Sequence, residues 1–299
     1  MTTALRPLDS VTPATPDLRL GEAVAEQARA YAARMNASPF AIALRAGRLE
    51  RREYVAFLAL MYPVVVGFNR ALIRSIAKVD HVRQSSFVRA LAKQLDEEQA
   101  HNQLWRAKLE AFGIDHEALY ADFEEYLARF GAAELDRLTG LVLSAVTRDL
   151  GAGDGRQFPN APFPDAVLAL YHHLWLTASR DDIGYWEHFA SQAGIEMIIF
   201  DVVSATILPG VCGNPQLDLA GVSTQWWREH GQLPGEEDGP NEEKRHLELS
   251  RIALDRSDMT VQARDRVLAR AEDAMRLFAS TLLCQETAAT RFTLNKYLA

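Results

Sequence analysis

Residues 96–105 read DEEQAHNQLW, and the spacing of their charged side chains bears on both the fold and the function of the protein. In a helix, Glu98 and His101 stand at positions i and i+3, and Glu97 and His101 at i and i+4. Both pairs then share one helix face, with Cβ atoms about 5–6 Å apart. A carboxylate and an imidazole on one face make half a metal site. The alternative is a solvated acidic face whose histidine forms a salt bridge.

A second turn of the same kind lies near the C-terminus. Residues 241–250 read NEEKRHLELS, in which Glu243 and His246 stand three residues apart and Glu242 and His246 four apart. Helix bundles build carboxylate-bridged two-metal sites from such turns on separate helices. Hard carboxylates combined with imidazoles suit Fe(II) and leave positions open for O2. Two turns together therefore favour a metal site over a pair of solvated faces.

Glu196 and His230 are two further candidate ligands. Glu196 lies in the apolar stretch QAGIEMIIFDVV, where an inward-facing, unpaired carboxylate would be costly and a metal ion would compensate for the cost. A partly wet groove would also accommodate it. His230 ends the stretch WWREH and could simply cap the last carbonyls of a helix. The sequence predicts His172, His173 and His188 at the surface or at the edge of the core.

Apolar residues recur at helical spacing in almost every segment between turn signals, and no stretch alternates at period two. The pattern predicts helices at residues 20–35, 51–79, 82–112, 115–130, 133–150, 165–179, 181–208, 223–230, 241–256 and 260–297. Pro63 should kink or split the second helix, and Gly113 should cap the third. No internal repeat or domain linker interrupts the pattern. We therefore expect a flexible tail at residues 1–16 and one all-α domain at residues 17–299.

Composition excludes several classes of function. The net charge is -8, from 32 basic and 40 acidic residues with no basic run, which argues against nucleic-acid binding. Cys212 and Cys284 give no disulfide framework and fit a reducing cytoplasm. No apolar segment of signal-peptide length begins the chain, and the most apolar stretches fall short of the ~18 apolar residues of a membrane span. We predict a soluble, cytoplasmic protein, with Cys212 in an exposed loop.

The two turns and the GIE triplet at 194–196 give the sequence a resemblance to the haem-oxygenase-like helical superfamily, and within it to the diiron oxidases and oxygenases. EEQAHNQLW resembles the turn in which a glutamate precedes a histidine ligand. GIE resembles the second core helix, and EKRHLELSRIAL is similar to the third ligand helix. The resemblance spans roughly residues 20–298, and it implies a haem-oxygenase-like helical bundle in a single domain.

The resemblance also implies which residues hold metal. Glu98 and His101 would bind one iron, and Glu196 would serve the other. The remaining ligands would come from the third ligand helix.

The third ligand helix of this family carries His-x3-Asp-x2-His, and the sequence departs from that pattern. Glu243 stands in place of the aspartate and His246 in place of the second histidine, whereas the first histidine would fall at Gly239. WWREH resembles the aromatic pair that precedes this missing histidine. We therefore expect His230 to supply the ligand across an inserted loop at residues 231–241.

What the resemblance implies about function is a nonhaem diiron oxidase or oxygenase, with two Fe(II) ions per chain and O2 as co-substrate. Its small-molecule substrate would be amino-acid-like or fatty-acid-like, and the reaction N-oxygenation, desaturation or C–C cleavage. One alternative is a metal-independent enzyme on the same fold, similar to thiaminase II or pyrroloquinoline-quinone synthase. Another is a non-enzymatic helical interaction protein. A homodimer is compatible with each of these expectations.

Overall fold

The computed structural model describes residues 19–146, 162–233, 235, 242–283 and 292–298. The predicted tail at residues 1–16 lies outside these ranges. In chain order the described helices are α1 (Leu20–Asn36), α2 (Pro39–Arg45), α3 (Arg51–Ile76), α4 (Ser85–Ala111), α5 (His116–Leu127), α6 (Ala132–Val146), α7 (Asp165–Ser179), α8 (Tyr185–Val202), η1 (Val203–Ile207), α9 (Leu208–Gly213), η2 (Pro215–Leu217), α10 (Gln225–Glu229), α11 (Glu242–Asp255), α12 (Val261–Leu283) and η3 (Leu294–Tyr297).

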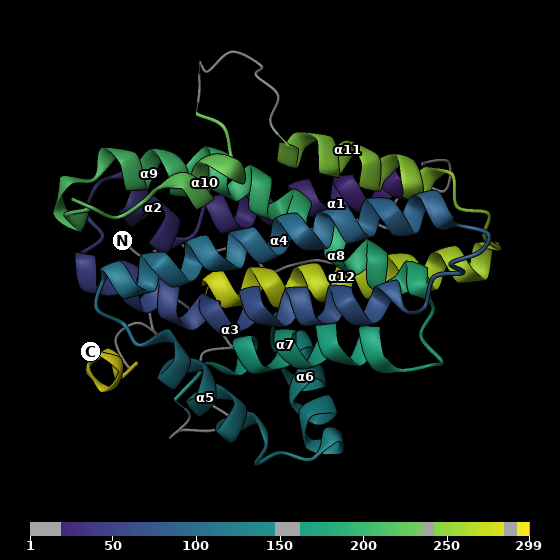
Figure 1. Cartoon of the computed structure of the whole chain (residues 1–299), viewed down its shortest axis with the longest axis horizontal. Coiled ribbons are helices and arrows are strands. Elements are labelled where there is room, and N and C mark those ends of the chain that lie inside the picture. The colour runs from purple at the N-terminus through teal and green to yellow at the C-terminus, as the bar shows by residue number, and fades with distance from the viewer. Residues whose placement is uncertain (1–18, 147–161, 234, 236–241, 284–291, 299) are drawn as a thin grey trace.

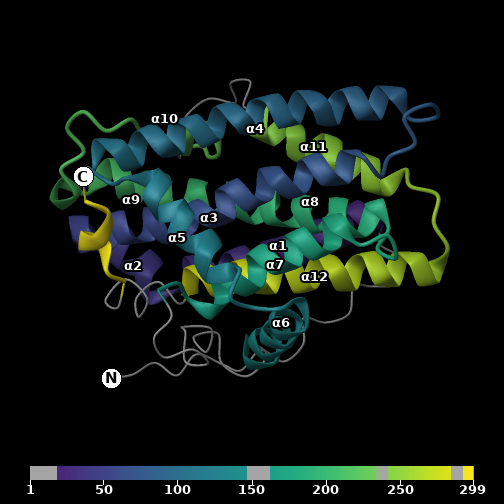
Figure 2. The same ribbon diagram turned by 60° about the horizontal axis from the view of Figure 1, so that its bottom comes forward.

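The helices form one bundle around α8, and the described residues contain no strand, which confirms the all-α, single-domain prediction. The helix α8 packs against α1 on one side and α12 on another, and α3 packs between α4 and α7. Long helices run along the long axis of the molecule, with α9, α10 and α11 above α4 and with α5 and α6 below α3 (Figure 1). Turning the molecule keeps α10 and α11 beside α4 (Figure 2). The predicted ligand helices α4, α8 and α11 therefore meet in one region.

Local sequence explains the ends of the helices that carry the site. The Glu50 side chain accepts from the backbone of the first turn of α3, and the Glu53 side chain accepts from the Glu50 N–H at 2.9 Å, so the two close a capping box. After α4 the chain turns at Gly113, whose φ of 76° is the left-handed conformation that glycine adopts without strain. This confirms the predicted cap. The helix α3 continues through Pro63 and is not split there.

The segment predicted as one helix over residues 181–208 contains a change of helix type. The α-helix α8 passes into a π-helical turn, η1, at Val203 and continues as α9. Single π-turns of this kind commonly accompany functional sites, because the extra residue re-aims the side chains that follow it. Cys212 was predicted in a loop, and this is wrong: it lies in α9, where it is exposed.

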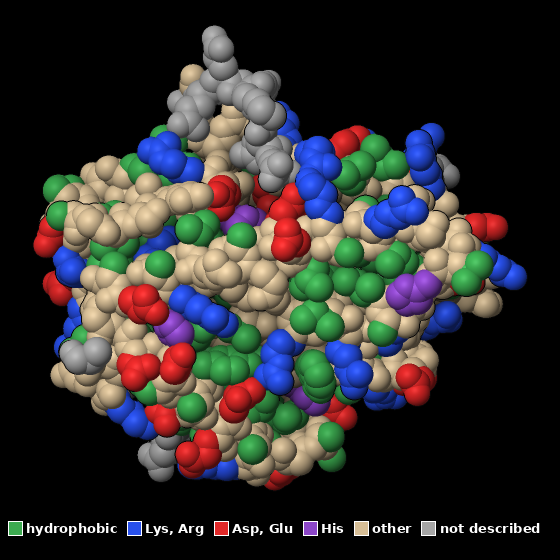
Figure 3. All heavy atoms as spheres, in the orientation of Figure 1, with side chains coloured by type: hydrophobic (Ala, Val, Ile, Leu, Met, Phe, Trp, Pro, Cys, Tyr) green, Lys and Arg blue, Asp and Glu red, His purple; other side chains and the backbone are tan. Residues whose placement is uncertain are grey.

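Two helical stretches, Arg51–Ile76 and Tyr185–Gly213, are long and apolar enough to cross a membrane. Their apolar windows are 78% and 61% buried inside the protein, so they have the burial of core helices in a soluble protein. On the face shown in Figure 3, acidic and basic side chains are interspersed, and neither sign gathers into one large patch.

Candidate metal centre

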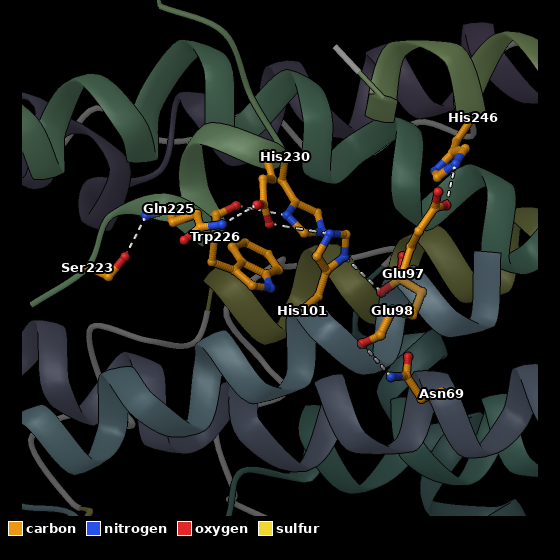
Figure 4. Close-up of polar contacts among 10 residues, drawn as sticks. Asn69, Glu97, Glu98, His101, Ser223, Gln225, Trp226, His230 and His246 are labelled. Carbon is orange, nitrogen blue, oxygen red and sulfur yellow. Dashed lines mark hydrogen bonds and ion pairs between the residues drawn. The ribbon is translucent and has the colours of Figure 1, made fainter. Parts of the chain in front are cut away.

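The six predicted ligands come from four separated parts of the chain. Their side chains are carried by α4 (Glu98 and His101), α8 (Glu196), the residue that ends α10 (His230) and α11 (Glu243 and His246). Figure 4 shows the α4, α10 and α11 side chains facing one another across the space between their helices. Glu98, Glu196, His230 and Glu243 line one cavity. Packing thus brings together groups that are up to 148 residues apart in sequence, from Glu98 to His246.

Glu98, His101 and His230 form the tightest cluster. Each offers one ligand atom, and these atoms lie within 4.8 Å of one another. His101 Nδ1 is 3.4 Å from Glu98 Oε2, and its Nε2 is 3.5 Å from Glu229 Oε2. Burial lowers the pKa of His101, but the hydrogen bond to Glu98 and the surrounding carboxylate charges outweigh it and raise the pKa. The three side chains have the donor types of one Fe(II) site.

His230 is buried and already oriented. Its Nδ1 donates to the Trp226 carbonyl at 2.8 Å, which leaves the Nε2 lone pair for another partner. The His101 ring lies 4.3 Å from it, centroid to centroid. Burial lowers the pKa of His230 well below its usual range, and the neighbouring His101 lowers it further. A neutral imidazole with one nitrogen fixed by a backbone carbonyl is the form in which histidine binds a metal.

Glu196 and Glu243 are buried carboxylates, and within the described residues neither forms an ion pair with a lysine or arginine. Gln94 donates to Glu196 Oε1 at 2.7 Å. Burial raises the pKa of Glu196 well above its usual range, and the charges of Glu243 and Glu98 add to the effect. Burial also raises the pKa of Glu243 to about 8, again with Glu98 adding to it. Three carboxylates this close repel in their ionised form, and a bound cation would remove that repulsion.

His246 lies against a different acid. Its Nε2 is 2.8 Å from Glu97 Oε2, and Lys93 contacts the other oxygen of Glu97 at 2.7 Å. Burial lowers the pKa of His246, and its Nδ1 has no hydrogen-bond partner. The structure therefore places His246 at the edge of the cluster, beside Glu97. The side chain of Glu242 and all of Gly239 lie outside the described residues.

Four residues around the site were not predicted, and two of them could have been. Gln94 precedes Glu98 by four residues, so helical spacing places it on the same face of α4. Glu229 is the neighbour of His230 in sequence. Asn69, which donates to the Glu98 carbonyl at 2.9 Å, carries no such signal. Neither does Lys108, a buried lysine whose ammonium lies 4.2 Å from the centre of the Trp227 ring.

The prediction for the three unassigned histidines was wrong for at least two of them. His173 is 2% exposed and His188 is fully buried, on α7 and α8. Burial lowers the pKa of His173 to about 4 and that of His188 to about 3, so both are neutral core side chains. Thr177 Oγ1 lies 2.9 Å from His188 Nδ1, which satisfies part of its hydrogen-bonding capacity.

Two solved structures have the same fold. One is a TenA homolog from Pseudomonas syringae pv. tomato, which matches with a TM-score of 0.59 and 14% sequence identity over 95% of this chain and 99% of its own. The other is a domain of unknown function with a heme oxygenase-like fold from Shewanella denitrificans, with a TM-score of 0.56 and 14% identity over 95% and 97% of the two chains. No family model and no curated protein matches the sequence.

These similarities define the architecture. The protein has the haem-oxygenase-like fold, over nearly the whole chain, as the sequence turns predicted. At 14% identity the likeness concerns the fold alone, so function has to be argued from the site.

Proposed function

We propose that the protein is a nonhaem diiron oxidase or oxygenase that uses O2 to oxidise a small organic substrate. The observation that carries the proposal is the group formed by Glu98, His101 and His230, whose ligand atoms lie within 4.8 Å of one another, with Glu98 and His230 also lining a cavity. Two more buried carboxylates, Glu196 and Glu243, line that cavity. This donor set combines carboxylate and imidazole, which suits Fe(II).

The residues divide between two iron sites in this proposal. Glu98, His101 and His230 would hold one ion. Glu196 and Glu243 would hold the other, with His246 as its imidazole ligand. Bound iron would supply the redox chemistry with O2.

This chain's own groups would hold and enclose the site. Trp226 fixes the His230 ring through its carbonyl, and Gln94 holds one oxygen of Glu196. Such partners set the orientation of a ligand and are typically worth 10–100-fold in metal affinity or activity. Apolar side chains line most of the cavity and exclude water from it, as oxidation by a reactive species requires.

The test is an anaerobic titration of the purified protein with Fe(II), followed by a pulse of O2 with the visible spectrum recorded. We expect two irons per chain and a transient absorption band after the pulse. One iron per chain would contradict the two-site assignment, and no iron uptake would remove the oxygenase. Either of these results would leave the fold unaffected.

A metal-independent enzyme on the same fold is the second candidate, favoured by the shared architecture with the TenA homolog. A thiaminase II-like mechanism would need a cysteine nucleophile in the cavity. Cys212 lies exposed on α9 and does not line the cavity, and Cys284 lies outside the described residues. Activity that persists in the presence of a strong chelator would support this candidate over the iron enzyme. A non-enzymatic interaction protein would have no use for a buried cavity lined by carboxylates.

A further inference from the structure

The cavity that Glu98 and His230 line is small. Its volume is about 80 Å³, whereas pockets for small organic molecules have volumes of about 300–1,000 Å³ and a cavity of about 150 Å³ holds benzene. None of its lining residues is exposed, and the partly buried ones among them are Val65, Glu98 and Ile199. The space is therefore suited to a guest of a few atoms.

The surface of the cavity is almost entirely apolar. The side-chain donors of Trp105, Trp227 and Thr281, which line it, are each taken by an acceptor within the protein. The indole nitrogen of Trp226 is buried away from the open space. A water molecule needs two to four polar partners, and apolar cavities without them stay dry. Beyond the ligand group, the lining therefore favours an apolar guest over water.

One end of the cavity lies at the carboxylates. Asn69 Nδ2 donates to the Glu98 carbonyl at 2.9 Å, which sets Phe68 of α3 level with the Glu98 turn of α4. Trp105 lies seven residues further along α4, or about 10 Å, and its Nε1 donates to the Leu58 carbonyl at 3.1 Å. The cavity therefore extends from the ligand group along α3 and α4, toward the start of α3.

The end away from the carboxylates is closed by aromatic rings. Phe57 stacks on Trp227, with ring centroids 6.3 Å apart and an angle of 16° between the planes, and both side chains are buried. By contrast, the partly buried lining residues are Glu98 itself, Val65, three residues before Phe68, and Ile199, three residues after Glu196. The cavity is thus least enclosed beside the ligand group.

We propose that this cavity is a binding site for a small apolar gas and that it holds O2 beside the irons. The supply of O2 rests on the proposed function, whereas binding of a gas requires only the cavity. O2 is uncharged and diatomic, so it fits the volume, and it dissolves better in apolar surroundings than in water. The organic substrate would then approach from the side of His101, which does not line the cavity and whose Nε2 is 3.5 Å from Glu229, a side chain that is 37% exposed.

The test uses xenon, an inert atom that occupies small apolar cavities, added to the metal-free protein labelled with ¹³C at its methionine methyl groups. Met35 and Met61 line the cavity, whereas Met197 and Met275 are buried on α8 and α12 without lining it. We expect saturable NMR shifts at Met35 and Met61 and none at the other two. No shift at the lining methionines, or equal shifts at all four, would overturn the proposal.

Benzene separates a gas site from a site for an organic substrate. The cavity has about half of the volume that holds benzene in a protein interior, so benzene should leave the methionine spectrum unchanged. Saturable benzene binding at Met35 and Met61 would overturn the assignment to a gas and would make the cavity a site for the organic substrate.

Variants connect the cavity with O2. Ile207→Phe and Val64→Leu add atoms at lining residues, and Val64→Leu is the smaller change if Ile207→Phe does not fold. The matched control is Ile42→Phe, at a side chain that is 44% exposed on α2 and does not line the cavity. Each filling variant should weaken xenon binding at least fivefold and slow the reaction of the iron-loaded protein with O2 at least fivefold, with two irons still bound. An unchanged O2 rate in a variant that has lost xenon binding would overturn the role in O2 supply.

Iron uptake separates the gas site from the oxygenase. Two irons per chain without xenon binding would overturn the gas site and leave the oxygenase standing. Xenon binding in a protein that takes up no Fe(II) would keep the cavity as a gas site and remove the oxygenase, and with it the supply of O2 to iron.

Discussion

His230 stacks face to face on Trp226, with ring centroids 3.7 Å apart and an angle of 14° between the planes, and its Nδ1 donates to the carbonyl of the same residue. One tryptophan thus fixes both the plane and the tautomer of the imidazole. Nε2 is left to face the rest of the cluster. The histidine proposed from the sequence as a ligand across an inserted loop is held in the orientation that such a role requires.

Replacing His230 should therefore remove one iron. In His230→Ala the ion would keep only two protein ligands, Glu98 and His101. We therefore expect Fe(II) uptake to fall from two ions per chain to one. Anaerobic titration with a metal-sensitive dye measures the stoichiometry. The control is His81→Ala, at an exposed histidine that precedes α4 and is not one of the proposed ligands. Two tightly bound irons in His230→Ala would show that His230 is not a ligand.

Glu243 and His246 should be needed for O2 consumption and dispensable for the fold. Glu243→Ala removes a carboxylate from the cavity wall, and His246→Ala removes the imidazole that lies against Glu97. We expect iron-dependent O2 uptake to fall at least 100-fold in each variant, while circular dichroism keeps the helical signal. An oxygen electrode makes the measurement. Wild-type uptake in both variants would rule out the assignment of α11 as a ligand helix.

Some of the site residues could be predicted from the sequence because the pattern that indicates them is local to one helix. Glu98 with His101 and Glu243 with His246 were predicted as ligands because helical spacing places the members of each pair on one face. Glu196 was predicted as a ligand because an unpaired carboxylate buried in an apolar helix is costly unless a cation compensates for it. Both patterns lie within a single helix, so they can be recognised without knowing how the helices pack.

The residues that were missed depend on tertiary packing. Lys108 is buried because three tryptophans from α4 and α10 surround it, and no pattern within α4 indicates that arrangement. His188 looked like a core-edge residue because α8 is apolar on all sides, which hides the direction of each side chain. The π-helical turn at Val203 also has no sequence signature, although it sets the side-chain directions that follow it.

Lys108 should make stability depend on pH. Burial lowers its pKa to about 7, against an unfolded value of 10.5. Between those values the unfolded chain binds the proton and the folded chain does not, so the free energy of unfolding rises with pH across this window. Below about pH 7 both states are protonated, and the full cost of burying the ammonium is present.

Lys108→Met keeps the apolar stem and removes the charge. We expect it to raise the free energy of unfolding, by about 2–3 kcal/mol more at pH 6 than at pH 9. Urea unfolding at the two pH values measures the difference, since other titrating groups are common to both proteins. An equal effect at pH 6 and pH 9 would show that the lysine is not buried in its charged form.

Gly67 should be irreplaceable where α3 crosses α7. A Cβ atom at this position would lie 2.5 Å from Cδ2 of the Tyr171 ring. The ring cannot easily retreat, because its hydroxyl lies 3.2 Å from Tyr120 Oη and accepts from Arg70 at 3.2 Å. Gly67→Ala should therefore lower the free energy of unfolding by about 1–3 kcal/mol, the usual cost of overpacking.

The matched control is Gly140→Ala on α6, where a Cβ atom would meet nothing within 4 Å. Alanine loses less conformational entropy than glycine in a helix, so this variant should be more stable than the wild type by about 0.5–1 kcal/mol. Urea denaturation of both variants compares the two substitutions in one experiment. Opposite signs are expected because the chemical change is the same and only the space around it differs. If Gly67→Ala were as stable as Gly140→Ala, the close approach of α3 to α7 would be incorrect, and with it the placement of the cavity wall that α3 supplies.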